Sequence, residues 1–448
     1  MASRRPLKTN RRRSVLPGGL TLLTERMDHL RSATVGIWLK KGSRHEEEDE
    51  SGISHFIEHL VFKGTHSRSC RDIARTIDRT GGLTGASTSK EFATFSVKVM
   101  DEHLPVALDL LTDILTNPAF DPAEIENERR VIYEEIKLTQ DNPEDLIGEA
   151  YYQSYFKNHP LGRSILGTNE TVAQFGRDRI VEFFQSSYIP SNIIVSAAGR
   201  VDHDALVDYF TKKFPGEGSS ASRRHLTQEG PSPTPNIERL YVSKSNLEQM
   251  HINIGFPGLH RSHGDRFPLF LLNDILGGSM SSRLFQNIRE KWGLAYSIFS
   301  FATSFCDTGT VTIYTGVDPM EARRTIDLII QELSSVCRSD VDAQELEDSK
   351  THLKGSLMLG LESSSARMAN LAINEMYFGR QFTPDDILES INGVALDDVI
   401  SMARRIFDTD KISLVVLGGA PTFDVDSLDL RMMRSTPVNQ DRTDSSVS

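Results

Sequence analysis

The segment Ser54-His-Phe-Ile-Glu-His-Leu-Val-Phe62 constrains this chain more than any other. As a helix it would be apolar on nearly every side and therefore buried, yet it carries three titratable groups. His55 and His59 are four residues apart on one helix face, and Glu58 lies one turn from His55 on an adjoining face. Two histidines at this spacing can reach one zinc ion. The segment predicts a metal-binding helix, with core histidines satisfied by backbone carbonyls as the alternative.

The order His-x-x-Glu-His carries chemical information of its own. It is the signature of the inverzincin class of zinc peptidases, the reverse of the more familiar zinc-protease helix. Burying imidazoles and a carboxylate without partners is costly, so a bound cation is the economical explanation of this pattern. For the helix start we expect Ser51 or Ser54 as the cap, and for its end Gly64.

A second helix, which begins at Asp121-Pro122, adds two carboxylates to a stripe that should face the core. Glu128 and Glu135 share this stripe with two isoleucines, whereas Glu134 points to solvent and should pair with a lysine or arginine. We expect Glu135 to be the third zinc ligand, which leaves a fourth position open for water. Glu128 would then orient a ligand histidine or the substrate. The alternative is that both carboxylates merely pair with arginines.

Composition narrows the class of protein. The net charge of −12 argues against nucleic acid as a partner, and no apolar run approaches the roughly 20 residues that cross a bilayer, so we expect no membrane association. The 3 cysteines have no metal-ligand spacing and are consistent with a reducing compartment. We expect the cytoplasm rather than an organelle matrix. The acidic run Glu46–Glu50 is interpreted first as a solvated loop and second as a contact for a basic substrate.

The chain repeats itself at about half its length of 448 residues. A strand followed by an amphipathic helix and a charged helix begins at Phe95 and recurs from Val311, a separation close to 216 residues. This predicts an α+β fold of two homologous domains, each a mostly antiparallel sheet packed with helices. Where the first copy has its histidines, the second has the apolar segment Phe267–Leu276, so one zinc ion per chain is expected.

The expected boundaries follow from this repeat and from local composition. A basic tail spans residues 1–14, a zinc-binding domain 15–215, a Gly-, Ser- and Pro-rich linker 216–236, a homologous domain without metal 237–424, and a polar, disordered tail 425–448.

Three segments together carry a specific resemblance: Ser54–Thr65, Glu128–Ile136 and Ser282–Ser297. With them, the chain from about Val15 to Ala420 resembles the zinc peptidases of the pitrilysin, insulysin and mitochondrial processing peptidase family. The likeness is greatest to the short, two-domain bacterial members related to the processing peptidase β subunit.

The resemblance implies roles for individual residues. It makes His55, His59 and Glu135 the zinc ligands and Glu58 the general base of a peptide hydrolase.

Relatives also carry an arginine and, seven residues later, a tyrosine that grip the substrate backbone and help stabilise the tetrahedral state. Arg289 and Tyr296 match this pattern, although the residues alone would suggest a surface charge and a core aromatic. The resemblance further implies a homodimer in which the C-terminal domain of one chain completes the active site of its partner.

One strand departs from the family pattern. Relatives usually carry Asn-Ala-x-Thr beside the metal, where the strand edge binds an extended peptide. Here Gly85, Ala86, Ser87 and Thr88 stand in its place, so the asparagine amide is missing and the resemblance does not carry over the usual substrate specificity.

The function expected from these features is zinc-dependent endopeptidase activity on peptides or unfolded polypeptides bound as an extended strand in a chamber. Zinc would lower the pKa of its water toward about 7, and Glu58 would take the proton from that water. One alternative is a non-catalytic structural homologue of the same fold, which the presence of all four metal-site residues disfavours. The other is a zinc hydrolase of small substrates, which the two-copy architecture disfavours.

Overall fold

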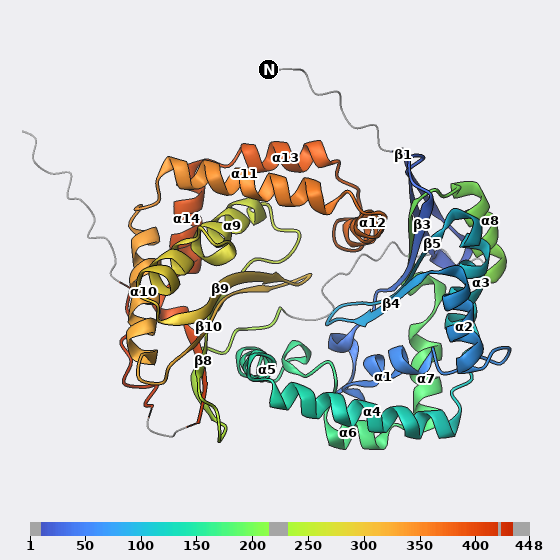
Figure 1. Ribbon diagram of the computed structural model, residues 1–448, viewed down its shortest axis with the longest axis horizontal. Helices are drawn as coiled ribbons and strands as arrows, with labels where there is room; N and C mark the ends of the chain where they lie inside the picture. Colours follow the sequence, from blue (N-terminus) through green and yellow to red (C-terminus); the bar gives the residue numbers. More distant parts are fainter. Residues whose placement is uncertain (1–9, 215–231, 420–422, 433–448) are drawn as a thin grey trace, which may run out of the picture.

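Two mixed sheets, one in each half of the chain, organise the protein (Figure 1). The computed structural model describes residues 10–214, 232–419 and 423–432. The N-terminal sheet has 6 strands in the order β1-β2-β6-β3-β5-β4, and the C-terminal sheet has 5 in the order β7-β11-β8-β10-β9. Their bounds are β1 (Asn10–Val15), β2 (Thr21–Arg26), β3 (Ser32–Leu39), β4 (Leu83–Thr88), β5 (Ala93–Met100), β6 (Ile193–Gly199), β7 (Arg239–Ser243), β8 (Met250–Pro257), β9 (Ala295–Ser304), β10 (Gly309–Val317) and β11 (Ser413–Gly418).

The two sheets have the same topology once β1 is set aside. β2, β6, β3, β5 and β4 correspond in order to β7, β11, β8, β10 and β9. The pairs β2–β6 and β7–β11 are parallel, and the other neighbouring strands are antiparallel. The predicted fold class, two similar α+β domains with mostly antiparallel sheets, is therefore confirmed.

Helices cover both sheets. The N-terminal half contains α1 (Ile53–Leu60), α2 (Cys70–Thr80), α3 (Leu104–Thr116), α4 (Pro122–Asp141), α5 (Pro143–Tyr155), α6 (Asn169–Gln174), α7 (Arg177–Ser187) and α8 (His203–Lys213). The C-terminal half contains α9 (Arg266–Asn273), α10 (Ala322–Cys337), α11 (Ala343–Gly360), α12 (Ser364–Phe378), α13 (Pro384–Asn392) and α14 (Leu396–Ile406), with π-helical turns at Asp274–Gly278 and Phe285–Lys291. No described helix is both long enough and apolar enough to span a bilayer.

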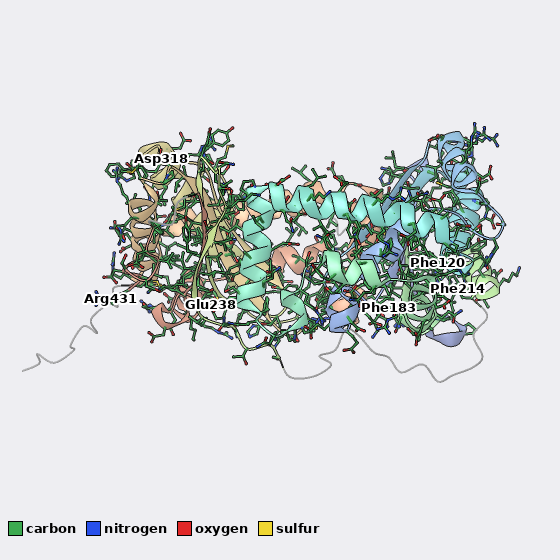
Figure 2. All side chains as sticks on the ribbon, turned by 90° about the horizontal axis from the view of Figure 1, so that it is seen from below. Phe120, Phe183, Phe214, Glu238, Asp318 and Arg431 are labelled. Carbon is green, nitrogen blue, oxygen red and sulfur yellow. The ribbon has the colours of Figure 1, made fainter. Side chains whose placement is uncertain are left out.

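Each half lends one helix to the sheet of the other half. α12 packs on β2, β3 and β6, and α5 packs on β8 and β11 (Figure 1). Figure 2 shows α4 running from the end of the molecule that carries Phe120 toward the C-terminal half, where α5 turns away from it. Two apolar clusters result, one under α12 around Trp38 and Leu371 and one under α5 around Tyr151 and Val415. The two halves therefore share hydrophobic cores as well as a connection along the chain.

A glycine makes room for each exchanged helix. A Cβ atom at Gly36 of β3 would lie 2.5 Å from the Sδ atom of Met368 in α12. A Cβ atom at Gly255 of β8 would lie 2.0 Å from the hydroxyl oxygen of Tyr151 in α5. These two glycines occupy corresponding strands, so the close approach of helix to sheet is part of the repeat.

The amino terminus differs from the expected basic tail. Asn10–Val15 forms β1, an edge strand that pairs antiparallel with β2. The Nε atom of Arg11 lies 2.8 Å from a carboxylate oxygen of Glu25, and Arg13 lies 2.8 Å from one of Glu375 in α12. The prediction was wrong for residues 10–14, because the acidic partners of these arginines are distant in sequence. Residues 1–9 lie outside the described residues.

The carboxyl terminus differs in the same way. Val425, Leu428 and Leu430 are buried in the core of the C-terminal half, so the predicted disorder from residue 425 is wrong up to residue 432. Isolated apolar residues in a polar stretch gave no periodic signal, and only the tertiary packing buries them. Residues 433–448, and residues 216–231 of the expected linker, lie outside the described residues, whereas 232–236 form no helix or strand.

Candidate metal centre

The helix α1 is fixed in the N-terminal core by its apolar face and at its start by a carboxylate. Ile53, Phe56 and Ile57 are fully buried. The side chain of Glu46 accepts hydrogen bonds from the backbone N–H groups of Gly52 and Ser54, each at 2.9 Å. A carboxylate is well placed at a helix N-terminus, where N–H groups lack partners within the helix.

This arrangement corrects two expectations. The expected serine caps are not used, because Gly52 occupies the N-cap position with a φ of 96°. The acidic run is not uniformly solvated either, since Glu46 is 3% exposed. Burial raises the pKa of Glu46 to about 7, against the lowering effect of the N–H groups that it binds.

The helix α4 begins and faces the core as predicted. The side chain of Asp121 accepts a hydrogen bond from the N–H of Ala123 at 2.7 Å, and Pro122 follows at the first helical position. Glu128 is buried with the isoleucines of the same stripe. Glu134 is exposed and pairs with Lys137 at 2.6 Å, as expected for the solvent face.

Three side chains, which we call the metal group, converge between α1 and α4: His55, His59 and Glu135. The Nε2 atom of His55 lies 3.5 Å from one carboxylate oxygen of Glu135, and the Nε2 atom of His59 lies 3.6 Å from the other. One donor atom from each residue lies within 4.8 Å of those of the other two. The side chains are 12%, 19% and 35% exposed, so the group is open to a small ligand from outside.

This donor set fits a zinc ion. Tetrahedral ligands at about 2.0–2.2 Å from zinc lie about 3.3–3.6 Å from one another, which matches the distances between Glu135 and the two rings. These separations are long for hydrogen bonds, so the three side chains face one another without being hydrogen-bonded to one another. Burial, together with the neighbouring His59, lowers the pKa of His55 to about 4, which keeps its imidazole in the neutral form that metals bind.

Glu128 lies behind this group and orients one of its rings. One of its carboxylate oxygens lies 3.1 Å from the Nδ1 atom of His59, which turns the Nε2 atom of that ring toward Glu135. Its other oxygen lies 2.6 Å from the Nζ atom of Lys63. The alternative of pairing with arginines is not what the structure shows, since the adjacent Arg129 pairs with Glu126.

Sequence reasoning missed Lys63. The spacing of four residues from His59 would place Lys63 on the same side if the helix continued to Gly64 as expected. The structure ends α1 at Leu60, and Lys63 reaches Glu128 from the turn that follows.

Glu58 is held by the strand expected to bind substrate. The hydroxyl of Thr88 donates a hydrogen bond of 2.6 Å to a carboxylate oxygen of Glu58. Burial raises the pKa of Glu58, and the hydrogen bond from Thr88 opposes that effect. Sequence reasoning placed Thr88 near the metal but missed this contact, which joins segments 30 residues apart.

The strand β4, which contains Gly85, Ala86, Ser87 and Thr88, is an edge strand. It pairs with β5, and among the described residues its other edge has no strand partner. Gly85 and Ser87 are exposed. An exposed edge of this kind can accept an extended peptide as a further strand.

Arg289 and Tyr296 lie together in the C-terminal half. The guanidinium carbon of Arg289 is 5.3 Å from the ring centroid of Tyr296. Tyr296 is 79% exposed, which contradicts the alternative of a core aromatic. Within the described part of the chain, no hydrogen bond, ion pair or cation–π contact joins this pair to His55, His59 or Glu135.

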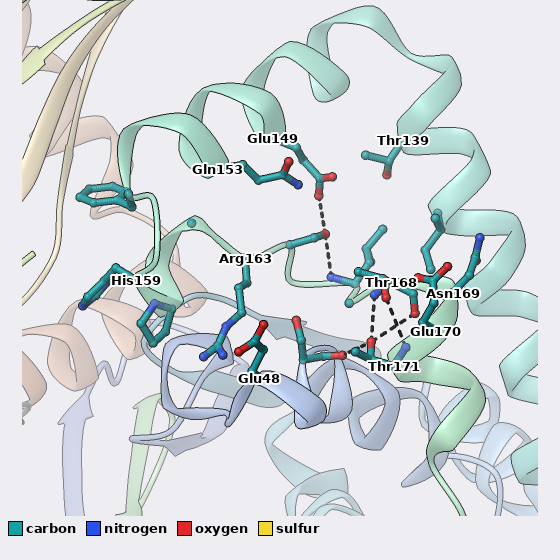
Figure 3. Close-up of a pocket in the computed structure, with 18 of the residues that line it drawn as sticks. Glu48, Thr139, Glu149, Gln153, His159, Arg163, Thr168, Asn169, Glu170 and Thr171 are labelled. Atoms are coloured by element: carbon teal, nitrogen blue, oxygen red, sulfur yellow. Dashed lines mark hydrogen bonds between the residues drawn. The ribbon is translucent and has the colours of Figure 1, made fainter. Parts of the chain in front are cut away.

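A cavity of about 770 Å³ opens between the end of α4, α5 and the segment 158–171 (Figure 3). Glu48, Glu149, Arg163 and Glu170 are among the charged residues that line it. His55, His59 and Glu135 do not line it, so it is separate from the metal group.

The sequence matches two family profiles in succession. Residues 21–169 match "Insulinase (Peptidase family M16)", and residues 174–353 match "Peptidase M16 inactive domain". The chain is 39% identical over 399 residues to a Bacillus subtilis protein named Uncharacterized zinc protease YmxG, covering 89% of this chain and 96% of that protein. The chain belongs to peptidase family M16. The M16 profiles meet near residue 170, whereas strand pairing keeps β6 with the N-terminal sheet.

Further relatives support the same assignment. An uncharacterized zinc protease of Streptomyces coelicolor is 38% identical, covering 91% of this M16 chain and 89% of the relative. The crystal structure of a Helicobacter pylori protease superposes with a TM-score of 0.82 at 23% identity, covering 92% of this chain and 100% of that one. The crystal structure of a peptidase M16 inactive domain from Pseudomonas fluorescens superposes with a TM-score of 0.84 at 17% identity, covering 92% of this chain and 98% of that one. The two structures support the fold.

Proposed function

We propose that this M16 chain is a zinc-dependent endopeptidase that hydrolyses peptides or unfolded polypeptides. The observation that carries the proposal is the convergence of His55, His59 and Glu135 beside Glu58, in a chain whose curated relatives are named zinc proteases. These three residues would hold one zinc ion per chain. When bound, zinc would supply a Lewis acid that makes a water acidic near neutral pH.

The residues around the metal group divide the remaining work. Glu58 would take the proton from the attacking water and pass it to the leaving amine, with Thr88 holding one of its carboxylate oxygens. Glu128 would keep the His59 ring turned toward the metal. The peptide would add to the free edge of β4 as an extended strand, because main-chain hydrogen bonds there are available to any sequence.

The Arg289–Tyr296 pair would contact the substrate from a second copy of the chain. Tyr296 is exposed, and within the described residues no hydrogen bond, ion pair or cation–π contact joins the pair to His55, His59 or Glu135 of its own chain. A homodimer in which each C-terminal half completes the site of its partner would bring the pair and the metal group together.

A non-catalytic role within the same fold is the alternative. Such a protein would need neither a carboxylate held as that of Glu58 is by Thr88 nor three metal-ligating side chains facing one another, and this chain has both arrangements. The geometry therefore favours the enzyme.

The decisive experiment replaces Glu58→Gln. We expect the variant to keep its zinc and to lose cleavage of a fluorogenic peptide library by about 10²–10⁴-fold, since removal of a general base costs roughly this much. Glu134→Gln, on the solvent face of α4, is the matched control and should retain full activity. Wild-type protein that holds zinc but cleaves no peptide, or a fully active Glu58→Gln variant, would overturn the proposal.

A further inference from the structure

The turn that joins β4 to β5 is anchored by the C-terminal half through Glu91. Glu91 is 2% exposed. Its carboxylate accepts hydrogen bonds from the backbone N–H of Cys306 at 3.0 Å and from the hydroxyl of Tyr377 at 2.7 Å. Cys306 lies in the turn between β9 and β10, and Tyr377 lies in α12, so both donors belong to the other half.

Arg44 joins the same cluster from a third segment. Its guanidinium donates to Glu91 at 2.6 Å and, with two nitrogens, to the carboxylate of Asp307 at 2.9 and 2.7 Å. The side chains of Arg44 and Asp307 are 9% and 1% exposed, so this ion pair is shielded from water. The backbone N–H of Arg44 also donates to the carbonyl of Lys90 in the β4–β5 turn at 2.8 Å. We call Arg44, Glu91, Cys306, Asp307 and Tyr377 the inter-half cluster.

Two short stretches of chain lead from this cluster to the metal centre. Glu91 lies three residues after Thr88, whose hydroxyl holds Glu58. Arg44 lies two residues before Glu46, whose carboxylate binds the first N–H groups of α1. Glu91 and Arg44 therefore connect the inter-half cluster to the strand that holds Glu58 and to the segment that precedes the helix carrying both histidines.

Rigid packing surrounds these stretches. A Cβ atom at Gly42 would lie 2.4 Å from the carbonyl oxygen of Ser89, and the N–H of Ser43 donates to that carbonyl at 3.0 Å. Because the segment before α1 and the β4–β5 turn are in contact, a shift in one must move the other.

We propose that Arg44 and Glu91 are positioning residues for Glu58 and α1, held in place by the turn at Cys306–Asp307. The C-terminal half of a chain would thus shape the hydrolytic site of that same chain, in addition to any contact that its Arg289–Tyr296 pair makes elsewhere. This inference rests on the proposed peptidase function only where activity is the measurement.

The test compares two isosteric substitutions that each remove one buried carboxylate from an ion pair between the halves. Asp307→Asn breaks the pair with Arg44. Glu375→Gln breaks the pair between Arg13 of β1 and α12, where the carboxylate side chain is 5% exposed. Tyr377→Phe, which removes a single hydrogen bond to Glu91, is a milder second variant should Asp307→Asn fold poorly.

We expect Asp307→Asn, measured well below its unfolding temperature, to keep zinc and a nearly unchanged KM but to lose about 10- to 100-fold in kcat, as a misplaced general base would. Glu375→Gln should keep its kcat. An unchanged kcat in Asp307→Asn, or an equal loss in both variants, would overturn the inference.

Hydrogen exchange separates this inference from the proposed function. Amide exchange in residues 52–60 and 83–92 should become about tenfold faster in Asp307→Asn and stay unchanged in Glu375→Gln, whether or not the protein cleaves peptides. If wild-type protein proves inactive, the proposed function fails and exchange alone decides the positioning role. Unchanged exchange in both segments of Asp307→Asn would then refute it.

Discussion

At the scale of single residues, three glutamates on α4 have three different environments. Glu128 is buried against His59 and Lys63, Glu135 faces the two imidazole rings, and Glu134 pairs with Lys137 in solvent. The helical period separates Glu134 from Glu135, because a rotation of about 100° per residue carries adjacent residues to different faces. Glu128 and Glu135 share one face and differ in the side chains that pack against them. The chemical type of a residue therefore says little about its role until its helix face is known.

Glu128 is expected to tune zinc affinity through His59. Replacing Glu128→Gln should weaken zinc binding by about 10–100-fold, because groups that orient a ligand histidine typically contribute this much. Competition with a chromophoric chelator measures the change directly. Glu134→Gln on the same helix is the control and should bind zinc like the wild type, and equal affinities for both variants would contradict the orienting role.

At the scale of elements, the exchanged helices α5 and α12 hold the two halves together. Each packs on the sheet of the other half over a glycine, and each contributes large side chains to an otherwise exposed sheet face. Burial of apolar surface at these two contacts stabilises the association of the halves. We expect the halves to unfold together for this reason.

The glycine in β8 tests this packing. Gly255→Ala would place a Cβ atom 2.0 Å from the hydroxyl oxygen of Tyr151, so α5 would have to move. We expect a loss of about 1–3 kcal/mol in the free energy of unfolding, measured with urea. Gly148→Ala is the control, because its Cβ would meet nothing within 4 Å, and it should stabilise the helix by about 0.5–1 kcal/mol. Equal stability of the two variants would rule out the close contact.

At the scale of the whole molecule, the proposed homodimer would bring the Arg289–Tyr296 pair of one chain to the site of its partner. Tyr296 is exposed, and among the described residues the edge of β4 opposite β5, where we propose that the peptide binds, has no strand partner. If the proposed homodimer forms, two differently damaged chains should repair one another.

Mixing Glu58→Gln chains with Tyr296→Phe chains tests that arrangement. Random reassociation makes half of the dimers mixed, and one of the two sites in each mixed dimer is intact, so about a quarter of wild-type activity should return. Each variant alone provides the baseline, and size-exclusion chromatography with light scattering reports the dimer. Activity of the mixture equal to the mean of the two separate samples would refute completion of the site by the partner.

The sequence by itself determined the local features. The spacing in His55-x-x-Glu58-His59 placed two imidazoles on one helix face. Asp121-Pro122 marked the start of α4, and the spacing of Glu128 and Glu135 with the isoleucines put both carboxylates on its inward stripe. The repeat near 216 residues predicted two similar sheets. Helical and strand periods are properties of neighbouring residues, which is why these predictions succeed without coordinates.

The tertiary structure alone decided which distant groups meet. The contacts of Thr88 with Glu58, Glu46 with the start of α1, and Asp307 with Arg44 join segments that no period relates. The arginines of β1 and the apolar residues after 424 were misassigned for the same reason, since their partners come from other parts of the fold. Burial and pairing of a polar side chain depend on what packs against it, and the packing of the whole chain sets that.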